Sequence, residues 1–318
     1  SKDEDVIMFG EDVGYFGGVF RTSDGLQEKH GKHRVFDSPL SEGGIAATAF
    51  GMGINGLRPV VEIQFADYIF PAYDQIVNEM AKIRHRSGGE FWCPVTIRTP
   101  AGGGIRGGHH HSQSPESQFT HTPGLKVVYC STPYNAKGLL ISAIEDNDPV
   151  IFFEPKRCYR GPFYGDPHNV PTWSDHPEAE VPESHYKIPL GDARLAIEGD
   201  GCTVISWGAM VHVCEQAIKD SGVSCDLIDL QTLVPWDVET VVKSVTKTGR
   251  CVIVHEAPKT SGFGAEMAAS IQERCFWNLE SPIERVTGWD TPFPHTTEWD
   301  YMPGPDRVIE AIVRTQEN

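Results

Sequence analysis

The sequence predicts an α/β protein of two domains, each built on a mostly parallel sheet that is flanked by helices. Short β-rich runs alternate with helical runs along most of the 318 residues, and such alternation is typical of parallel sheets covered on both faces. The length also suggests two domains, since domains commonly span about 100–200 residues. A proline-rich stretch at about 155–185 interrupts the alternation. We therefore predict domains at 1–185 and 186–318, joined by this irregular connection.

The first half shows five expected strands and three expected helices. The helix over 71–86 has the clearest signals, because Pro71 suits a first helical turn and Ile76, Met80 and Ile83 share one face. The strands are expected at 6–9, 58–65, 94–98, 124–130 and 149–154, and the other helices at 42–54 and 135–146.

The second half resumes the same alternation, which predicts a second and smaller α/β domain. Strands are expected at 202–208, 224–230, 250–256 and 282–288, and helices at 209–222, 235–249, 262–276 and 305–315.

Charge and composition exclude several classes of protein. The formal net charge of -17 repels nucleic acid, and no apolar stretch approaches the ~18 residues of a membrane span. We therefore expect no nucleic acid and no membrane as partners. The eight cysteines are never closer than 11 residues, which excludes a CxxC pair and predicts free, mostly buried thiols in a reducing compartment.

A glycine-rich loop with three consecutive histidines, residues 102–117, has several interpretations. Gly102, Gly104 and Gly107 match GxGxxG after a strand, but no helix is expected directly behind them to face a pyrophosphate. The adjacent histidines 109–111 diverge along the chain, so they rarely converge on one metal ion. A loop that presents one histidine to a site and a plain solvated loop both remain open.

Glu42 begins the most informative segment. Ser41 can cap a helix, and Glu42 then lies in its first turn, where the helix dipole favours a carboxylate. Stabilisation of the helix end is the simplest interpretation. The residues that follow, GGIAATAFGMG, are unusually small and apolar, so this helix can approach another backbone or a ligand closely and strip water from Glu42. A carboxyl so placed can hold or give a proton at neutral pH.

The segment 199–201 reads GDG, like the start of the motif by which thiamin enzymes hold magnesium and diphosphate. That motif needs an asparagine further along the chain, and the segment 225–231 has none. We therefore interpret 199–201 as a turn before a strand.

Several stretches together resemble one known family over nearly the whole chain. They are GEDVG (10–14), GVFR (18–21), the run at 25–79, HSQSPE (111–116), HEAPKTSGFGAE (255–266) and ERVTGWDTPFP (284–294). The chain closely resembles the β subunit of the thiamin diphosphate-dependent decarboxylating component of 2-oxo acid dehydrogenase complexes, most of all the branched-chain (2-oxoisovalerate dehydrogenase) type.

The resemblance implies a pyrimidine-binding domain, a transketolase-like C-terminal domain and half of an active site. It implies an α subunit that carries the GDG motif and holds Mg²⁺, a heterotetramer of two α and two β chains, and thiamin diphosphate between α and β. A dihydrolipoyl acyltransferase core with its lipoyl domain is the further partner that it implies.

Two catalytic residues follow from the resemblance. Glu42 corresponds to the carboxylate that binds N1′ of the aminopyrimidine, and His111 corresponds to a histidine that faces the thiazolium and handles protons during decarboxylation and acyl transfer. His109 and His110 lie outside the pattern.

Further cofactor-binding residues are implied in the same way. Leu40, Gln64 and Tyr68 correspond to the lining of the pyrimidine pocket, and Glu11 to an acidic residue near it. The family also holds a structural monovalent cation, usually K⁺, at positions that correspond to Val95, Thr96, Ala143, Asp146 and Asp148.

The implied reaction is oxidative decarboxylation of branched-chain 2-oxo acids with reductive acylation of the lipoyl group. The same chemistry on pyruvate or acetoin, a non-catalytic scaffold chain and a self-sufficient transketolase activity are the alternatives. The proline-rich insert at 160–183 resembles bacterial members, which favours the cytoplasm over a mitochondrial matrix. Relative to the family, the chain begins just after an amphipathic leading helix, so we expect a segment to precede it.

Overall fold

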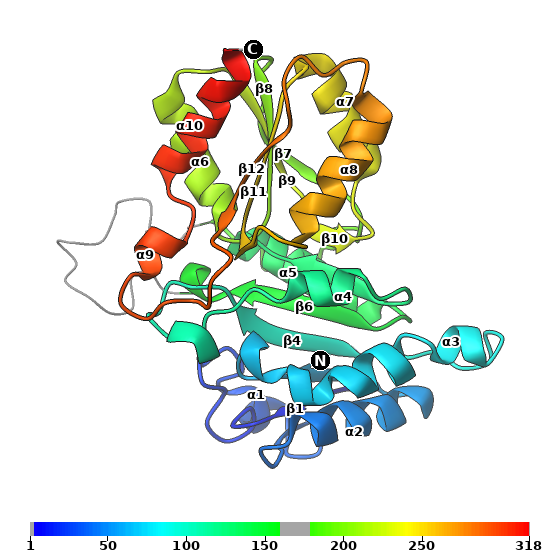
Figure 1. Cartoon of the computed structure of the whole chain (residues 1–318). Helices are drawn as coiled ribbons and strands as arrows, with labels where there is room; N and C mark the ends of the chain where they lie inside the picture. Colours follow the sequence, from blue (N-terminus) through cyan, green and yellow to red (C-terminus); the bar gives the residue numbers. More distant parts are fainter. Residues whose placement is uncertain (1–2, 160–178, 318) are drawn as a thin grey trace.

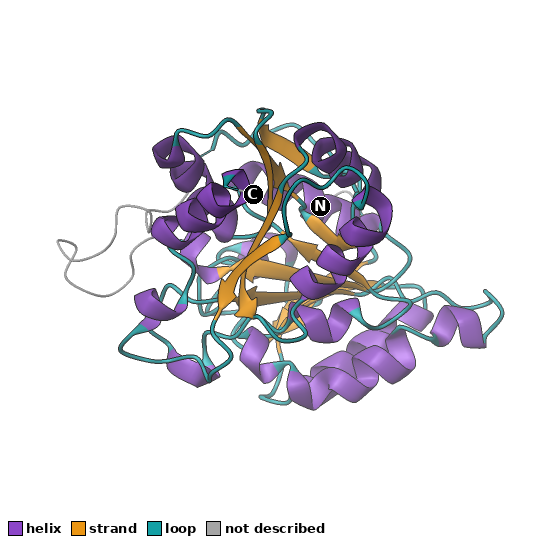
Figure 2. Ribbon diagram, turned by 45° about the horizontal axis from the view of Figure 1, so that its top comes forward, coloured by secondary structure: helices purple, strands orange, loops and turns teal. Residues whose placement is uncertain are grey.

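The computed structural model describes residues 3–159 and 179–317 of the chain. Two sheets, of seven and five strands, form the centres of two stacked halves, the blue-to-green half below the yellow-to-red half in Figure 1. Figure 2 shows helices on both sides of the strands. The predicted α/β class with two mostly parallel, helix-covered sheets is confirmed.

The first sheet has the strand order β10-β5-β6-β4-β3-β1-β2. Its pairs are parallel except for β10 with β5. The strands are β1 (Val6–Gly10), β2 (Val35–Asp37), β3 (Arg58–Glu62), β4 (Thr96–Ala101), β5 (Lys126–Tyr129), β6 (Val150–Pro155) and β10 (Thr232–Val234). All five strands predicted in this half are present, whereas the three-residue strands β2 and β10 were not predicted.

The helices around this sheet include α2 and α5, which were predicted within two residues of their bounds. The α-helices are α1 (Leu26–His30), α2 (Glu42–Ile54), α3 (Ile83–Arg86), α4 (Glu116–Thr120) and α5 (Pro133–Glu145). Single-turn elements lie at η1 (Ala66–Tyr68), η2 (Phe70–Ala72), η4 (Gly108–His110) and η5 (Lys156–Cys158), and η3 (Gln75–Met80) is a π-helix.

The continuous helix predicted over 71–86 is wrong. The segment is divided into η2, the π-helix η3 and α3. Ile76, Met80 and Ile83 are nevertheless buried in the core, at 0%, 1% and 9% exposure. The apolar face was therefore predicted correctly. The wider π turn changes the register of the backbone between the residues of that face.

The second sheet has the strand order β12-β11-β8-β9-β7. Only its edge strand β7 pairs in the antiparallel direction. Its strands are β7 (Arg194–Ile197), β8 (Cys202–Ser206), β9 (Cys225–Asp229), β11 (Cys251–Pro258) and β12 (Glu284–Gly288), and its helices are α6 (Met210–Ser221), α7 (Val238–Thr248), α8 (Phe263–Cys275), α9 (Glu298–Tyr301) and α10 (Pro305–Gln316). The four strands and four helices predicted in this half are present, and β7 and α9 were not predicted.

One strand joins the two halves. β10 follows β9 in the chain, yet it pairs with β5 at the edge of the first sheet, and the Tyr129 amide donates to the carbonyl oxygen of Gln231 at 2.9 Å. One apolar cluster also runs through both halves, with Tyr129 and Phe153 on one side and Trp207 and Leu233 on the other. The division at residue 185 stays a prediction, but the halves share a sheet and a core.

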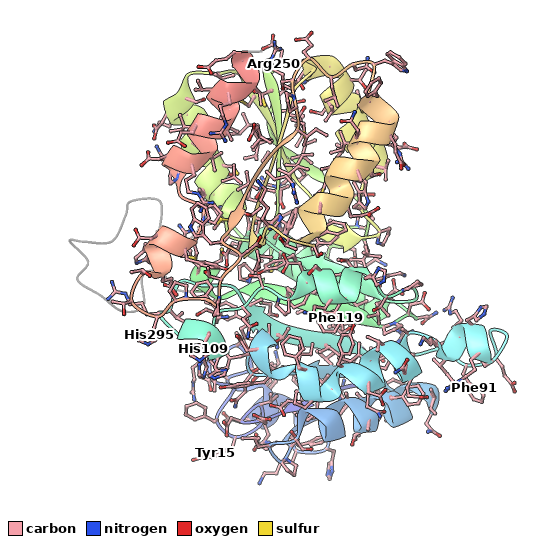
Figure 3. All side chains as sticks on the ribbon, viewed as in Figure 1. Tyr15, Phe91, His109, Phe119, Arg250 and His295 are labelled. Carbon is pink, nitrogen blue, oxygen red and sulfur yellow. The ribbon has the colours of Figure 1, made fainter. Side chains whose placement is uncertain are left out.

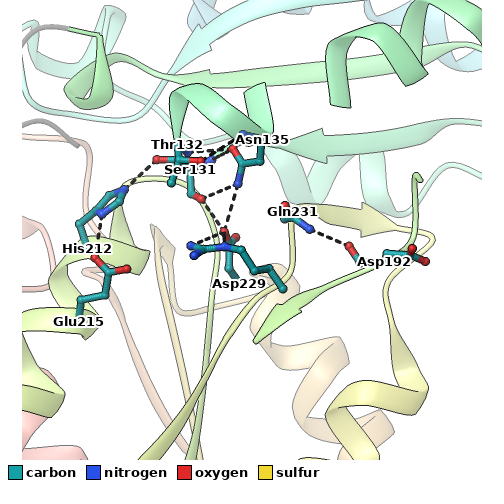
Figure 4. Close-up of polar contacts among 9 residues, drawn as sticks. Ser131, Thr132, Asn135, Asp192, His212, Glu215, Asp229 and Gln231 are labelled. Carbon is teal, nitrogen blue, oxygen red and sulfur yellow. Dashed lines mark hydrogen bonds and ion pairs between the residues drawn. The ribbon is translucent and has the colours of Figure 1, made fainter. Parts of the chain in front are cut away.

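A polar junction around Asp229 also joins the halves (Figure 4). Asp229, at the end of β9, is fully buried. Its Oδ2 accepts from the Ser131 hydroxyl at 2.5 Å, from Asn135 Nδ2 at 3.3 Å and from Arg194 Nη2 at 3.2 Å. His212 adds a contact from α6, with Nε2 2.7 Å from the carbonyl oxygen of Ser131.

Several smaller predictions have mixed outcomes. Ser41 is the N-cap residue of α2, but its side chain makes no capping hydrogen bond. All eight cysteines are free and seven are buried, as predicted. Within the predicted proline-rich connection, residues 160–178 lie outside the described part of the chain, and 179–185 contain no helix or strand. No helix among the described residues combines the length and the apolar character needed to cross a bilayer.

Candidate functional site

Glu42 is the first residue of α2, a helix built largely from small residues. Glu42 is buried, with 9% of its surface exposed. A Cβ added to Gly43 would lie 3.1 Å from the carbonyl oxygen of Pro71. The small residues therefore allow the close approach to another backbone that the sequence predicts, and the first turn of α2 is set against η2.

A second carboxylate lies near Glu42. Glu11 directly follows β1 and is 7% exposed. Burial raises the pKa of the Glu11 carboxyl, and the nearby carboxylates of Glu42 and Asp12 raise it further. Glu11 Oε1 has no hydrogen-bond partner among the described residues. Such a pair favours a shared proton or a donor from a bound ligand.

Tyr68 and His111 form a direct pair beside these carboxylates. The Tyr68 hydroxyl lies 2.7 Å from Nε2 of His111. Burial raises the pKa of the Tyr68 phenol, and Asp67, Glu42 and Glu11 add to that shift, so Tyr68 stays neutral and can share a proton with the imidazole. The ring of Phe65 packs edge-on against His111 at 4.6 Å between centroids.

The remaining predicted pocket residues surround this group unevenly. Gln64 donates to Asp12 Oδ2 at 2.9 Å and to the Glu11 carbonyl oxygen at 3.5 Å. Leu40 is 81% exposed. The structure therefore brings Glu11, Glu42, Gln64, Tyr68 and His111 together, and it leaves the apolar wall at Leu40 open to solvent. Phe65 and Asp12 were not predicted.

The histidine-rich loop presents one of its three histidines to this site. His109 and His110 are exposed and pack on each other at 4.1 Å between ring centroids. In Figure 3 His109 lies at the outer edge of the junction between the halves, close to His295. Of the open interpretations, a loop that carries one functional histidine is the one that the geometry supports.

The glycines of the loop allow close packing and do not form a dinucleotide site. The loop is followed by the single turn η4 and not by a helix aimed at a pyrophosphate. A Cβ on Gly103 would lie 2.6 Å from Met302 Sδ, and one on Gly108 would lie 3.1 Å from His295. The C-terminal half therefore packs directly on the loop backbone. Within residues 3–159 and 179–317, no three potential metal-ligating side chains come together.

The predicted cation ligands form a different arrangement. Lys126 Nζ lies 2.5 Å from Asp146 Oδ2 and 3.7 Å from Asp148 Oδ2, and Arg84 pairs with Asp148 at 2.9 Å. The carbonyl oxygen of Val95 accepts from the Val150 amide, and that of Ala143 accepts from Asp146. The Thr96 hydroxyl is buried without a partner among the described residues. An ammonium already lies between the two carboxylates, and K⁺ binding at these five positions stays a prediction.

Comparison with known families agrees with this architecture. The family described as "Transketolase, pyrimidine binding domain" matches residues 1–162, and "Transketolase, C-terminal domain" matches residues 191–308. A solved structure titled "Split gene transketolase, inactive beta4 tetramer" superposes with a TM-score of 0.75 at 18% identity, covering 99% of this chain and 93% of that one. The chain is therefore a transketolase-like protein with both of these domains.

Relatives of higher identity show to which family of transketolase-like proteins the chain belongs. The chain is 57% identical over 318 residues to "2-oxoisovalerate dehydrogenase subunit beta" of Pseudomonas aeruginosa, covering 99% of this chain and 91% of the relative. It is 56% identical to "2-oxoisovalerate dehydrogenase subunit beta, mitochondrial" of Dictyostelium discoideum (99% and 82%), and 45% identical to "Pyruvate dehydrogenase E1 component subunit beta" of Acholeplasma laidlawii (98% and 92%). The chain belongs to the family of 2-oxoisovalerate dehydrogenase β subunits.

This family implies thiamin diphosphate as cofactor, and the site fits its pyrimidine half. A buried carboxyl oxygen of Glu11, which has no hydrogen-bond partner within residues 3–159 and 179–317, accompanies the carboxylate of Glu42. Aromatic rings of Phe65 and Tyr68 and the imidazole of His111 adjoin them. Carboxylates and aromatic faces suit a heteroaromatic ring with an amino group.

Proposed function

We propose that this chain, together with an α subunit, catalyses thiamin diphosphate-dependent oxidative decarboxylation of branched-chain 2-oxo acids and reductive acylation of a lipoyl group on an acyltransferase core. The observation that carries the proposal is the Tyr68–His111 pair beside the buried carboxylates Glu11 and Glu42. The identity to relatives named for 2-oxoisovalerate, which exceeds that to relatives named for pyruvate, supports the branched-chain substrates.

Glu42 and Glu11 act on the pyrimidine ring of the cofactor. When bound, thiamin diphosphate supplies a carbon nucleophile and a sink for the electrons released by decarboxylation. Glu42 binds N1′ and exchanges a proton there, which its burial in the first turn of α2 supports. Glu11 keeps a proton near Glu42, since burial and the neighbouring carboxylates raise its pKa. Leu40 and Gln64 complete the pocket walls.

His111 and Tyr68 act on the substrate side. The imidazole of His111 gives or takes a proton at the substrate carbonyl and then at the lipoyl sulfur, because an imidazole can both accept and donate a proton. The neutral Tyr68 hydroxyl, 2.7 Å away, orients the imidazole. Phe65 limits rotation of the ring from a second side.

The α subunit completes the site. Tyr15, Phe16 and Leu40 are 89%, 49% and 81% exposed, and exposed apolar groups next to a site are typical of a protein interface. The α subunit covers them, holds Mg²⁺ and the diphosphate, and forms a heterotetramer of two α and two β chains. A structural K⁺ at Val95, Thr96, Ala143, Asp146 and Asp148 is part of the proposal. A cytoplasmic location is also part of the proposal, and the resemblance of the proline-rich insert at 160–183 to bacterial members supports it.

The decisive experiment is reconstitution of the chain with its α subunit and assay on 2-oxoisovalerate and on pyruvate with a lipoyl-domain acceptor. We expect higher kcat/KM on 2-oxoisovalerate, by about 10-fold or more, since pocket contacts contribute ~1–3 kcal/mol per methylene. A preference for pyruvate would assign the chain to the related chemistry. A Glu42→Ala complex that keeps full activity would reduce the chain to a scaffold.

A further inference from the structure

We propose that Glu256 and Glu298 of the C-terminal half are positioning residues that hold the backbone of the loop 102–113 and thereby set the place of His111. Their role for His111 rests on the proposed function, whereas their contacts with the loop do not. Neither carboxylate belongs to the catalytic group, which consists of Glu11, Glu42, Tyr68 and His111. Both carboxylates come from the C-terminal half, and the whole catalytic group comes from the other half.

Glu256 binds the start of the loop. It lies near the end of β11, is 7% exposed, and its Oε2 accepts from the Gly103 amide at 3.0 Å. A Cβ on Gly102 would overlap the same carboxylate, and Gly102 has a φ of +78°. Only glycine combines this backbone conformation with this approach. The carboxylate and the loop backbone are therefore in direct contact.

Glu298 binds the middle of the loop. It begins α9 and is fully buried, and its Oε2 and Oε1 lie 3.1 Å and 3.3 Å from the Arg106 amide. Arg106 has a φ of +54°, a conformation that costs a non-glycine residue free energy and persists only when the surroundings enforce it. The hydrogen bond to this buried carboxyl is one such restraint.

A buried cation links the two carboxylates to the site. Lys156 is fully buried. Burial lowers the pKa of its ammonium to about 8, although Asp67, Glu256 and Glu298 oppose this shift electrostatically. Lys156 Nζ lies 5.6 Å from the centre of the Phe65 ring. Burial raises the pKa of the Glu256 and Glu298 carboxyls, and the Lys156 ammonium opposes that shift at both.

Contacts lead from Lys156 to the histidine. The Phe65 ring that faces Lys156 also packs on His111. At its base the loop is closed, since the Gly102 amide donates to the Gln113 carbonyl oxygen at 3.0 Å and the Gln113 amide donates to Asp67 Oδ1 at 3.1 Å. Release of the middle of this closed loop would leave His111 held by Tyr68, by Phe65 and by the hydrogen bonds at the base of the loop.

The test uses Glu298→Ala and Glu298→Gln in the full chain, free and reconstituted with the α subunit. A displacement of about 1 Å at a reacting group can cost on the order of 100-fold in rate. We expect Glu298→Ala to lower kcat by about 10-fold to 100-fold with little change in KM. Glu298→Gln keeps an acceptor oxygen, so it restores most of kcat. A residue needed for stability alone would not produce this split between kcat and KM or this rescue.

A second readout does not depend on activity. Trypsin cleaves after arginine, so the rate of cleavage at the Arg106–Gly107 bond, followed by mass spectrometry, reports release of the loop. We expect faster cleavage in Glu298→Ala and Glu256→Ala and near wild-type cleavage in both Gln variants. The matched control is Asp229→Ala, which removes an equally buried carboxylate at the other junction and leaves the Arg106 cleavage rate unchanged.

The outcomes separate the two proposals. Folded Ala variants with unchanged cleavage at Arg106 would overturn the positioning role, whatever the activity of the complex. If the Ala variants do not fold, the Gln variants are compared with an isosteric Glu298→Met variant. Equal cleavage rates and equal kcat in the Met and Gln variants would then overturn the positioning role as well. A wild-type complex inactive on both 2-oxo acids would overturn the proposed function and leave the cleavage test intact.

Discussion

The two halves of the molecule meet at two buried polar junctions that differ in what they hold. Around Asp229, side chains of one half meet side chains of the other, all carried by regular elements or their ends: Ser131 and Asn135 at the start of α5, and Arg194 on β7. Around Glu256 and Glu298, side chains of the C-terminal half bind the backbone of a loop.

The difference shows how one interface serves two purposes. Contacts between regular elements fix the relative orientation of the halves, because neither partner can move without the sheet or helix that carries it. Contacts with a loop backbone fix a segment that has no regular hydrogen-bond partners of its own. The first junction should therefore control the stability of the chain, and the second the geometry of His111.

Replacement of His111 should have the largest effect on activity and little effect on stability. We expect His111→Ala to lower kcat of the reconstituted complex by about 10²–10⁴-fold, the range for loss of a general acid or base. Steady-state kinetics and urea unfolding of the same preparations measure the two effects. The adjacent His110→Ala is the matched control, since His110 is exposed and packs on His109; equal losses in both variants would contradict the assignment.

Replacement of Asp229 should show the opposite pattern. Asp229→Ala leaves Arg194, Ser131 and Asn135 without their common acceptor, and we expect a loss of about 2–3 kcal/mol in the free energy of unfolding. The expected loss is at the low end for a broken buried pair because 37% of the Arg194 side chain is exposed. Urea titration measures it, and kcat below the unfolding transition should be unchanged. A large loss of kcat without destabilisation would erase the distinction between the junctions.

The free energy of unfolding should depend on pH, as a smaller effect, through Glu116, which lies at the second junction. Burial raises the pKa of its carboxyl to about 8, while Trp207 Nε1, 3.3 Å away, favours ionisation and Glu256 opposes it. A pKa above the unfolded value means that Glu116 stabilises the fold while protonated and that this contribution is lost as pH rises from about 4.5 through about 8.

The matching variant is Glu116→Gln, which mimics the protonated form. Wild-type stability should fall between pH 5 and pH 8 relative to the variant by on the order of 2 kcal/mol. Chemical unfolding at several pH values measures the difference, with the exposed Glu310→Gln as control. A constant difference across this range would show that Glu116 is ionised throughout.

The sequence was sufficient for most of the fold because the core faces repeat with the period of their elements. The exceptions lack such a repeat. β10 has three residues, and its pairing with β5 depends on a contact between segments about a hundred residues apart, which no local pattern encodes. The division of 71–86 depends on a π turn, whose apolar residues keep nearly helical spacing.

The proposed catalytic residues were predicted through the resemblance, whereas the residues proposed to position them were not predicted. Glu42 and His111 lie in recognisable stretches, whereas Glu256 and Glu298 contact a loop more than 150 residues away in the chain. A signal for Glu256 was present, because it lies near the carboxyl end of a parallel strand, where functional groups of α/β proteins collect. Glu298 had no such signal, since α9 is a four-residue helix.

The strand β10 also has a consequence for synthesis of the chain on the ribosome. The first sheet cannot be completed until residues 232–234 have left the exit tunnel, although its other six strands end at Pro155. Until then the edge of β5 keeps unpaired amide and carbonyl groups, which are a site for pairing with other chains. The nascent first half therefore needs protection at that edge during translation, and a fragment cut at the boundary between the halves would carry the same exposed edge permanently.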